Sequence, residues 1–329
     1  MTTDARAAGP PSVSVVIPVL DDAEALPAAV AAALAQEYAG VLDVCIAVGP
    51  SHDDTESVAQ GLAADSRVRV VANPAGITAA GLNAAIAGST GEIVVRVDGR
   101  SVLPPGYVAR VVERLATTGA HNVGGVMAAE GRNPVQRAVA AAMTSRFGTG
   151  DARFHTGGPE GPVDTVYLGA FPRAVLERLG GYDETLRVVE DGELNWRIRA
   201  SGGTVWFDPS LRVRYSPRAS MPALARQYLT YGRWKREMIR RHPQSRRWRQ
   251  TVAPTAVVAN AVAIIGGLLV DPRLLAIPAA YVAATVLAAL VAGRRSGPVV
   301  VALLPVVFAV MHHAWGIGYL IGPERTPHS

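Results

Sequence analysis

The sequence predicts an α/β domain with a parallel sheet, followed by a group of membrane-spanning helices. Two observations support this fold class. Between residues 12 and 98, short runs rich in β-branched residues alternate with alanine-rich runs, which is the pattern of strands connected by helices. After residue 251 the charged residues almost disappear, and three long apolar runs follow.

Four strands and three helices are expected in the first hundred residues. The strands are predicted at 12–19, 42–48, 68–73 and 92–98, and the helices at 23–36, 54–65 and 76–89. Ligands of such sheets bind at the carboxyl ends of the strands. Polar residues follow three of these ends, namely Asp21 and Asp22, the loop 49–55, and Asp98. The sequence therefore predicts a ligand site at this edge of the sheet.

Two absent motifs argue against two common nucleotide-binding classes. No G-x-G-x-x-G follows the first strand, which argues against dinucleotide binding, and no G-x-x-x-x-G-K-[ST] occurs, which argues against a nucleotide hydrolase. Mixed elements are expected from residue 98 to about 220. Within them, Glu190, Asp191 and Glu193 open a predicted helix over 193–201. The helix dipole favours one or two such acids, so a third indicates a function.

The three apolar runs cover residues 252–270, 274–292 and 299–321, within a C-terminal region 251–322. Each is long enough to cross the roughly 30 Å hydrocarbon layer. The alternative is a set of buried helices in a large soluble core. Arginines cluster between residues 240 and 249 and again at 294–295, so the positive-inside rule places the N-terminal part in the cytoplasm and the tail 323–329 outside. We expect a multi-pass cell-membrane protein whose residues 1–11, which lack the apolar core of a signal peptide, are disordered.

The net charge of +5 comes mainly from a basic segment directly before the first apolar run. Residues 221–250 place apolar side chains on one helical face and cations elsewhere, which predicts an amphipathic helix at the membrane surface. The alternative is a solvated linker helix. A basic segment beside a membrane helix favours anionic lipid as its partner rather than nucleic acid.

Five stretches resemble inverting family 2 glycosyltransferases of the GT-A fold in their order and spacing: VSVVIPVLDD, GPSHDDT, RVDGRS, LGAFPRAVLERLGGYDE and VEDGELNWRIRASGG. The similarity covers residues 12–250 and favours a membrane-anchored group resembling the succinoglycan-biosynthesis glucosyltransferase. It implies a Rossmann-like, nucleotide-sugar-binding domain over 12–220. This domain would move a hexose from a nucleotide sugar, most readily a UDP-sugar, to a lipid-linked or polysaccharide acceptor in cell-envelope or exopolysaccharide assembly. Alternatives are a polyprenyl-phosphate hexosyltransferase and a catalytically weak domain that acts as an assembly partner.

The resemblance also implies roles for individual residues. Asp98 would hold a divalent cation, Mg²⁺ or Mn²⁺, on the donor diphosphate, and Asp191 would be the general base. The other residues implied on the donor side are Pro18, Asp22, Asp53, Asn83 and Arg100. Those implied on the acceptor or phosphate side are Gly169, Ala170, Phe171, Glu190, Glu193, Trp196, Gln227, Arg233 and Trp234.

The sequence departs from the family pattern at the metal motif, where Arg100 replaces the second acid of D-x-D. A guanidinium cannot ligate a metal, but it can form a bidentate pair with phosphate. We expect Asp98 to keep a cation bound largely through the donor's phosphates, while Arg100 supplies part of the positive charge. The alternative is that Arg100 points to solvent or pairs with Asp98. The adjacent His312 and His313 diverge on a helix, and the sequence assigns them no role.

Overall fold

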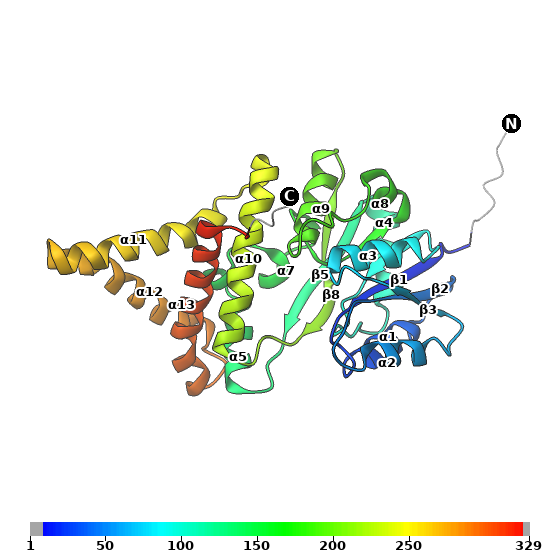
Figure 1. Cartoon of the computed structure of the whole chain (residues 1–329), viewed down its shortest axis with the longest axis horizontal. Coiled ribbons are helices and arrows are strands. Elements are labelled where there is room, and N and C mark those ends of the chain that lie inside the picture. The colour runs from blue at the N-terminus through cyan, green and yellow to red at the C-terminus, as the bar shows by residue number, and fades with distance from the viewer. Residues whose placement is uncertain (1–8, 325–329) are drawn as a thin grey trace. The chain divides into compact units, whose positions relative to one another are not determined.

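The computed structural model describes residues 9–324, so the expectations for 1–8 and 325–329 lie outside the described residues. The described chain divides into two compact units (Figure 1). The sheet unit comprises the residues up to Met127 together with Gly158–Arg214, and the helical unit comprises Ala128–Gly157 together with the residues from Tyr215 onward. The predicted single domain over 12–220 differs from this division, because residues 128–157 group with the C-terminal helices.

Eight strands form one mixed sheet in the order β3-β2-β1-β4-β7-β5-β8-β6. The strands are β1 (Val13–Val19), β2 (Leu42–Val48), β3 (Val68–Ala72), β4 (Ile93–Arg96), β5 (Asn122–Ala129), β6 (Gly161–Pro162), β7 (Tyr167–Pro172) and β8 (Val205–Tyr215). The helices of this unit are α1 (Leu26–Leu34), α2 (Thr55–Leu62), α3 (Thr78–Ala87), α4 (Tyr107–Thr118), α8 (Arg173–Leu179) and α9 (Glu190–Ala200).

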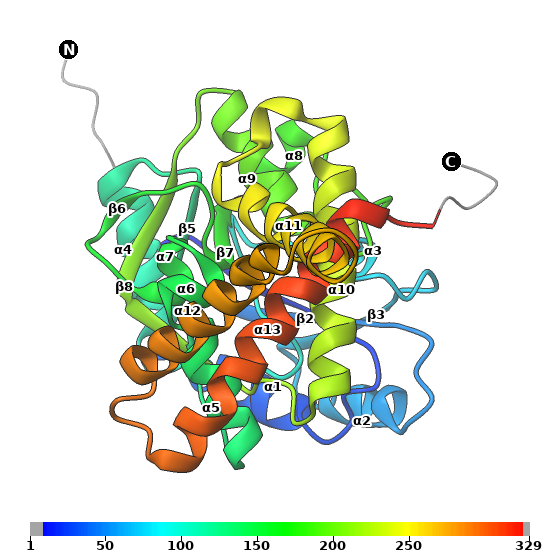
Figure 2. The ribbon, with the colours of Figure 1, turned by 90° about the vertical axis from the view of Figure 1, so that its left-hand side faces the viewer.

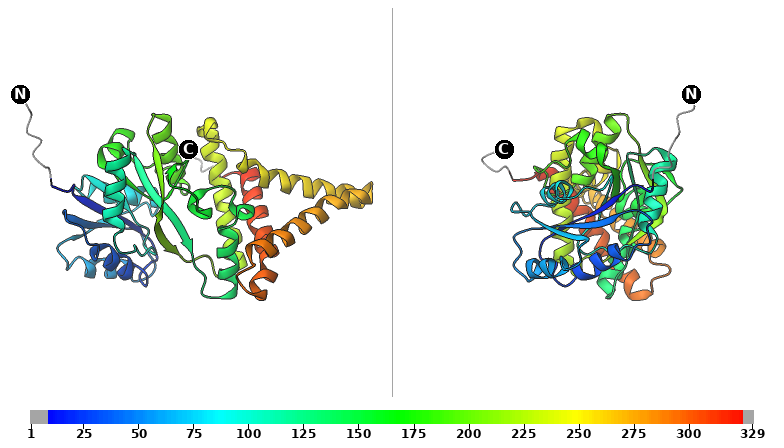
Figure 3. Two further views of the ribbon diagram at one scale, coloured as in Figure 1. Left: turned by 180° about the vertical axis from the view of Figure 1, so that it is seen from behind. Right: turned by 90° about the vertical axis from the view of Figure 1, so that its right-hand side faces the viewer.

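The first four strands are parallel, as the sequence predicts. β1 pairs with both β2 and β4, and β2 pairs with β3. Figures 1 and 3 show α1 and α2 on one face of these strands and α3 on the other, the arrangement that right-handed crossovers produce. The carboxyl ends of β1, β2 and β4 therefore meet at one edge. β7 then joins β4 in the antiparallel direction.

The two faces of β4 have different chemistry. Ile93, Val95 and Val97 belong to the large apolar cluster that also contains residues of α1 and α4. Successive side chains of a strand point to opposite faces, so Arg96 and Asp98 lie together on the other face. A buried arginine thus stands two residues before the carboxylate that the sequence singles out.

The far half of the sheet unit is tied to α4 by one buried carboxylate. The Asp208 side chain on β8 is 1% exposed and accepts hydrogen bonds from Nε of Arg110 at 2.8 Å and Nε of Arg114 at 2.9 Å. It also accepts from the backbone N–H of Ser210 at 2.8 Å and the Ser210 hydroxyl at 2.6 Å. Burial opposes the charge, but these hydrogen bonds outweigh it and lower the pKa of Asp208 to about 2.

We expect Asp208→Asn to lower the free energy of unfolding by about 2 kcal/mol, because Arg110 and Arg114 both lose their buried charged partner. Since the folded-state pKa of Asp208 lies below its ordinary value, this contribution is present above pH 4 and is lost as the pH falls from about 4 to 2. Denaturant unfolding of the detergent-solubilised protein measures both effects. Asp54→Asn, at an exposed position whose side chain does not cap α2, is the control and should change the midpoint little. Equal effects of the two variants would contradict the prediction.

The helical unit contains the three apolar runs as helices, which confirms their predicted helical structure. Its elements are α5 (Pro134–Met143), α6 (Arg146–Thr149), α7 (Arg153–Thr156), α10 (Met221–Arg241), η1 (Pro243–Ser245), α11 (Arg249–Leu269), η2 (Pro272–Leu275), α12 (Ala276–Ala292) and α13 (Pro298–Ile321). The helix α11, the segment formed by η2 with α12, and α13 have mean hydropathies of 2.0, 2.3 and 1.9. By length and composition each is able to cross a membrane.

α10 packs along α13 (Figure 2). The two backbones come into direct contact, since Gly232 lies against the carbonyl of Trp315 and Gly318 against the carbonyl of Leu229. Leu224 and Tyr228 precede Gly232 by two turns and one turn, lie on the same face and are buried. The apolar face of α10, for which the sequence suggests contact with the membrane surface, is therefore covered by another helix.

Candidate active site

One buried guanidinium organises the carboxyl end of β4. The Arg96 side chain is 11% exposed, and its Nε and Nη2 atoms each lie 3.1 Å from Oδ1 of Asp98. Its Nη1 atom lies 2.9 Å from Oε1 of Glu190, the first residue of α9. The guanidinium also lies over the Tyr182 ring, 5.9 Å from the centroid. Arg96 therefore connects the end of β4 directly to the start of α9.

The charges of this cluster depend on one another. Burial alone would lower the pKa of Arg96, but Asp98 and Glu190 raise it well above the ordinary value. Burial raises the pKa of Glu190, and the neighbouring Arg96 opposes that rise. An unpaired charge at this depth would cost several kcal/mol. The cluster is therefore stable only when the arginine and its two acids are all present.

Asp191 follows Glu190 on the first turn of α9 and contributes to the same electrostatic environment, because its charge acts on both Arg96 and Glu190. Its Oδ1 atom accepts a hydrogen bond from the backbone N–H of Gly192 at 2.6 Å, and the residue is half-buried. The preceding residue, Val189, has a φ of +63°. A β-branched residue rarely adopts this left-handed conformation, so the backbone entering α9 is strained.

Asn83 of α3 holds the loop that leads to α9. Its amide group donates to the carbonyl of Tyr182 at 2.9 Å and to Oε1 of Glu184 at 2.8 Å, and it accepts from the backbone N–H of Tyr182 at 2.9 Å. Gly181, with a φ of +69°, lies against the Asn83 side chain, where a Cβ would collide with it. The residue that the sequence suggests beside the donor thus fixes the loop carrying Tyr182.

Glu193 also points into the protein. Its carboxylate is 2% exposed and pairs with Arg197 one turn later, at N–O distances of 2.7 to 2.9 Å. Arg197 in turn donates to the carbonyls of Leu179 and Gly181 at 2.6 and 2.7 Å. Glu190 and Glu193, both suggested for the acceptor side, are therefore enclosed in ion pairs that position the loop and α9.

Arg100 reaches back to the end of β1 rather than to Asp98. It forms an ion pair with Asp22, and its Nη2 atom donates to the carbonyl of Asp21 at 3.1 Å. The chain comes close to Asp22 at Gly99, where a Cβ would lie 2.8 Å from Oδ2 of Asp22. The Arg100 side chain is 64% exposed. Arg100 therefore links the residues that follow β4 to those that follow β1, and its side chain remains exposed to solvent.

Asp53 organises the loop between β2 and α2. It accepts hydrogen bonds from the Thr55 hydroxyl, the Thr55 backbone N–H at 3.0 Å and the Ala23 backbone N–H at 3.1 Å. These hydrogen bonds lower the pKa of Asp53, and the bond from the Thr55 hydroxyl has the largest effect. The Thr55 hydroxyl oxygen accepts from the backbone N–H of Asp22 at 2.8 Å. Asp53 and Asp22 thus lie in one network at the exits of β1 and β2.

The remaining predicted site residues are distributed over both units. In the sheet unit, Pro18 packs beside Gly81, Trp196 is half-buried on α9, and three residues are buried in β7: Gly169, Ala170 and Phe171. In the helical unit, all three predicted residues lie on α10: Gln227, Arg233 and Trp234. The structure brings together Asp98, Glu190 and Asp191 in one cluster, and Asp22, Asp53 and Arg100 at the strand exits.

Sequence reasoning missed Arg96 and Tyr182. One signal for Arg96 is visible in the sequence, since it is a lone cation inside the apolar run IVVRV. A charge buried in a strand needs an acidic partner, and Asp98 is the nearest acid along the chain. Nothing in the sequence indicates Tyr182 or identifies Glu190 as the second partner.

The acids at this edge fit a cation that is held mainly by a substrate. Among residues 9–324, no group of three or more His, Cys, Asp and Glu side chains is arranged to hold a metal ion. Arg96 binds one oxygen of Asp98, and the carboxylate is 39% exposed. Mg²⁺ commonly binds through one or two carboxylates together with substrate phosphates. Asp98 therefore suits the role of a single protein ligand.

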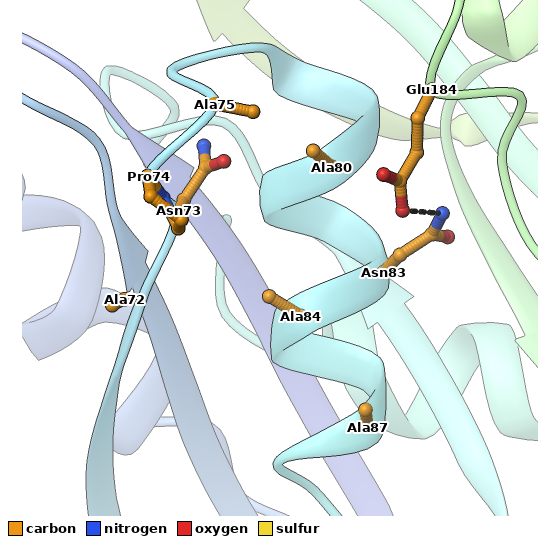
Figure 4. A pocket seen from close by; sticks show the side chains of 9 residues that line it. All are labelled: Ala72, Asn73, Pro74, Ala75, Ala80, Asn83, Ala84, Ala87 and Glu184. Atoms are coloured by element: carbon orange, nitrogen blue, oxygen red, sulfur yellow. Dashed lines mark hydrogen bonds between the residues drawn. The ribbon is translucent and has the colours of Figure 1, made fainter.

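A surface groove of about 420 Å³ lies beside α3 (Figure 4). Figure 4 shows Glu184 and Asn83 joined by a hydrogen bond on one side of α3 and the loop after β3 on the other. The groove is lined by Ala72, Asn73, Pro74, Ala75, Ala80, Asn83, Ala84, Ala87 and Glu184. Because neither Asp98 nor Asp191 lines it, the groove is not the centre of the charged cluster.

Comparisons with solved structures agree with this fold. The mannosyltransferase PcManGT from Pyrobaculum calidifontis, in complex with GDP-Man and Mn²⁺, is similar with a TM-score of 0.58 and 19% identity, over 94% of this chain and 86% of that one. Residues 1–349 of S. aureus TarS, in complex with UDP, give a TM-score of 0.50 and 13% identity over 94% and 90%. The predicted fold class is confirmed.

Sequence comparison identifies the family. The model described as glycosyltransferase like family 2 matches residues 10–235. The succinoglycan biosynthesis protein ExoA of Rhizobium meliloti (strain 1021) is 32% identical over 285 residues, which cover 84% of each chain. The matched region contains the strand exits, the Arg96 cluster and α9. The chain belongs to glycosyltransferase family 2.

Proposed function

We propose that this glycosyltransferase moves a hexose from a nucleoside diphosphate sugar to a lipid-linked or glycan acceptor, with inversion, during assembly of a cell-surface polysaccharide. The observation that carries the proposal is the Arg96 cluster, which joins Asp98 to the first turn of α9, where Asp191 lies. The polysaccharide role is supported by the similarity to a succinoglycan biosynthesis protein. A nucleotide-sugar donor is supported by the structural neighbours bound to GDP-Man and UDP.

In the proposed reaction, Asp191 accepts the proton of the acceptor hydroxyl. The hydroxyl oxygen forms a bond to the anomeric carbon as the bond from that carbon to the diphosphate breaks, and the nucleoside diphosphate leaves with the electron pair. A single displacement inverts the anomeric centre. Glu190 is paired with Arg96 and Glu193 with Arg197. Within residues 9–324, the Asp191 carboxylate instead accepts a hydrogen bond from the backbone N–H of Gly192, which leaves it as the acid of this turn suited to take a proton.

The leaving diphosphate requires positive charge. A divalent cation held by Asp98 would supply Lewis-acid stabilisation of the leaving group. Asp98 would retain its orientation through Arg96, which binds one of its oxygens and leaves part of the carboxylate exposed. Arg100 would be a second positive group that binds the donor's phosphate. Its ion pair with Asp22 would hold it near the end of β1. We propose a UDP-sugar as the first donor to test.

The helical unit would anchor the enzyme in the membrane. It contains three helices long and apolar enough to cross a bilayer, preceded by the arginines between residues 240 and 249. The positive-inside rule then places the sheet unit on the cytoplasmic side, where nucleotide sugars are available. A membrane location agrees with an acceptor that carries a lipid.

We expect Asp191→Asn to lower kcat by about 10²- to 10⁴-fold, because the amide cannot take the acceptor proton. Donor binding should change little, since Asn keeps the shape of the side chain. Turnover is measured as nucleoside diphosphate release with membrane lipid as the acceptor, and donor affinity by isothermal titration. Glu177→Gln on α8, an exposed acid outside the cluster, is the matched control. An Asp191→Asn variant that keeps more than a tenth of the wild-type kcat would contradict the assignment.

We expect Arg96→Met to shift the acid limb of the pH–activity profile to higher pH. Burial already raises the pKa of Glu190, and Arg96 opposes this rise, so its removal leaves Glu190 protonated at higher pH and frees Asp98 from its orienting bond. We expect kcat to fall at least 10-fold. Arg69→Met, on the neighbouring part of the parallel sheet and exposed, is the control. A folded Arg96→Met enzyme with a wild-type pH profile would show that the cluster does not act on catalysis.

A further inference from the structure

The last apolar helix, α13, has arginines at both of its ends. Arg294 and Arg295 lie in the turn before it, and Arg137 of α5 reaches the carbonyl of Ser296 at 3.4 Å. At the other end, Arg236 of α10 donates to the carbonyl of Leu320 and, at 3.3 Å, to that of Tyr319. A helix that crosses the bilayer would place one of these basic ends on the far side. By the positive-inside rule, both ends belong on the same side.

α13 also has a charged helix packed along it. Gly232 of α10 lies against Trp315, and Gly318 lies against Leu229, so the two helices touch through their backbones. Around this contact α10 carries a dense set of charged residues: Arg226, Arg233, Lys235, Arg236, Glu237 and Arg240. If α13 crossed the membrane, α10 would be drawn into the hydrocarbon together with these charges, and each charge near the centre of the bilayer is strongly unfavourable.

Packing within the helical unit accounts for the apolar composition of α13. Five of its larger apolar side chains are buried: Val300, Leu304, Val307, Phe308 and Met311. Phe308 meets Phe147 of α6 edge to face at 4.9 Å, and Nε2 of His312 lies 2.8 Å from the Phe147 carbonyl oxygen. A helix that is covered on several sides needs apolar residues all round, whether or not it crosses a membrane.

What remains exposed on α13 is a narrow apolar stripe. The exposed apolar residues recur at helical spacing along one side: Val299, Ala302, Val306, Ile317, Leu320 and Ile321. Figure 2 looks at the helical unit from the side toward which α11 extends, and α13 runs across this side next to α10. The stripe is therefore the part of α13 available to lipid.

We propose that α13 lies in the plane of the membrane interface, with this stripe against the acyl chains, and that only α11 and α12 cross the bilayer. The turn between them, with Asp271 and Arg273, then reaches the far side, and the chain after α13 is on the same side as the arginines before α11. This inference rests on the membrane anchoring in the proposed function. It replaces the three spans and the outside tail that hydropathy alone predicts.

Single-cysteine labelling tests this arrangement directly, because Cys45 is the one cysteine of the sequence and is buried. In a Cys45→Ala background, Arg273→Cys reports the turn between α11 and α12, and Glu324→Cys reports the end of α13. Both positions are exposed. A membrane-impermeant maleimide is applied to intact cells and, separately, to permeabilised cells, and donor turnover in isolated membranes shows that each variant is folded.

We expect Arg273→Cys to be labelled in intact cells and Glu324→Cys only after permeabilisation. Labelling of Glu324→Cys in intact cells would establish a third span and overturn the proposal. Protection of Arg273→Cys in intact cells would show that the α11 and α12 pair does not cross, which overturns it as well. Either failure leaves the catalytic proposal standing when the variants still turn over donor.

Discussion

A positive charge buried in the sheet is the constraint on which the site depends. Arg96 can remain inside the protein only if acids neutralise it, and its two partners come from different parts of the fold. Asp98 lies just beyond β4, while Glu190 begins α9. The two ion pairs of Arg96 therefore fix the position of the Asp98 carboxylate relative to the first turn of α9, which carries Asp191. In the proposed mechanism, the contacts that neutralise Arg96 also set the geometry for sugar transfer.

A second layer of polar contacts holds this geometry in place. Asn83 fixes the loop at Tyr182, and Arg197 ties the carbonyls of Leu179 and Gly181 to Glu193. These restraints lie on both sides of the strained residue Val189. A strained backbone persists only where its surroundings determine it, and the network around α9 supplies these restraints next to Asp191.

The regular part of the fold was predictable because its signals are local. Runs rich in β-branched residues predicted the four parallel strands, and long apolar runs predicted α11, α12 and α13. Ion-pair partners are not local, so they could not be read from the sequence. Glu193 looks like a ligand-binding residue in the sequence but is buried against Arg197, whereas Asn83 lines the surface groove and hydrogen-bonds to Tyr182 and Glu184. Arg100 pairs with Asp22 because the chain comes close to Asp22 at Gly99. Hydropathy likewise does not distinguish a helix covered by protein from one covered by lipid.

The most direct test of the account is turnover of a panel of nucleoside diphosphate sugars by the full-length protein in membranes that contain lipid acceptors, with Mg²⁺, with Mn²⁺ or with EDTA. We predict that one donor is consumed, that nucleoside diphosphate release needs the divalent cation, and that the transferred sugar has the inverted anomeric configuration. Binding of a donor without turnover under every cation and acceptor condition, or a product with retained configuration, would contradict it.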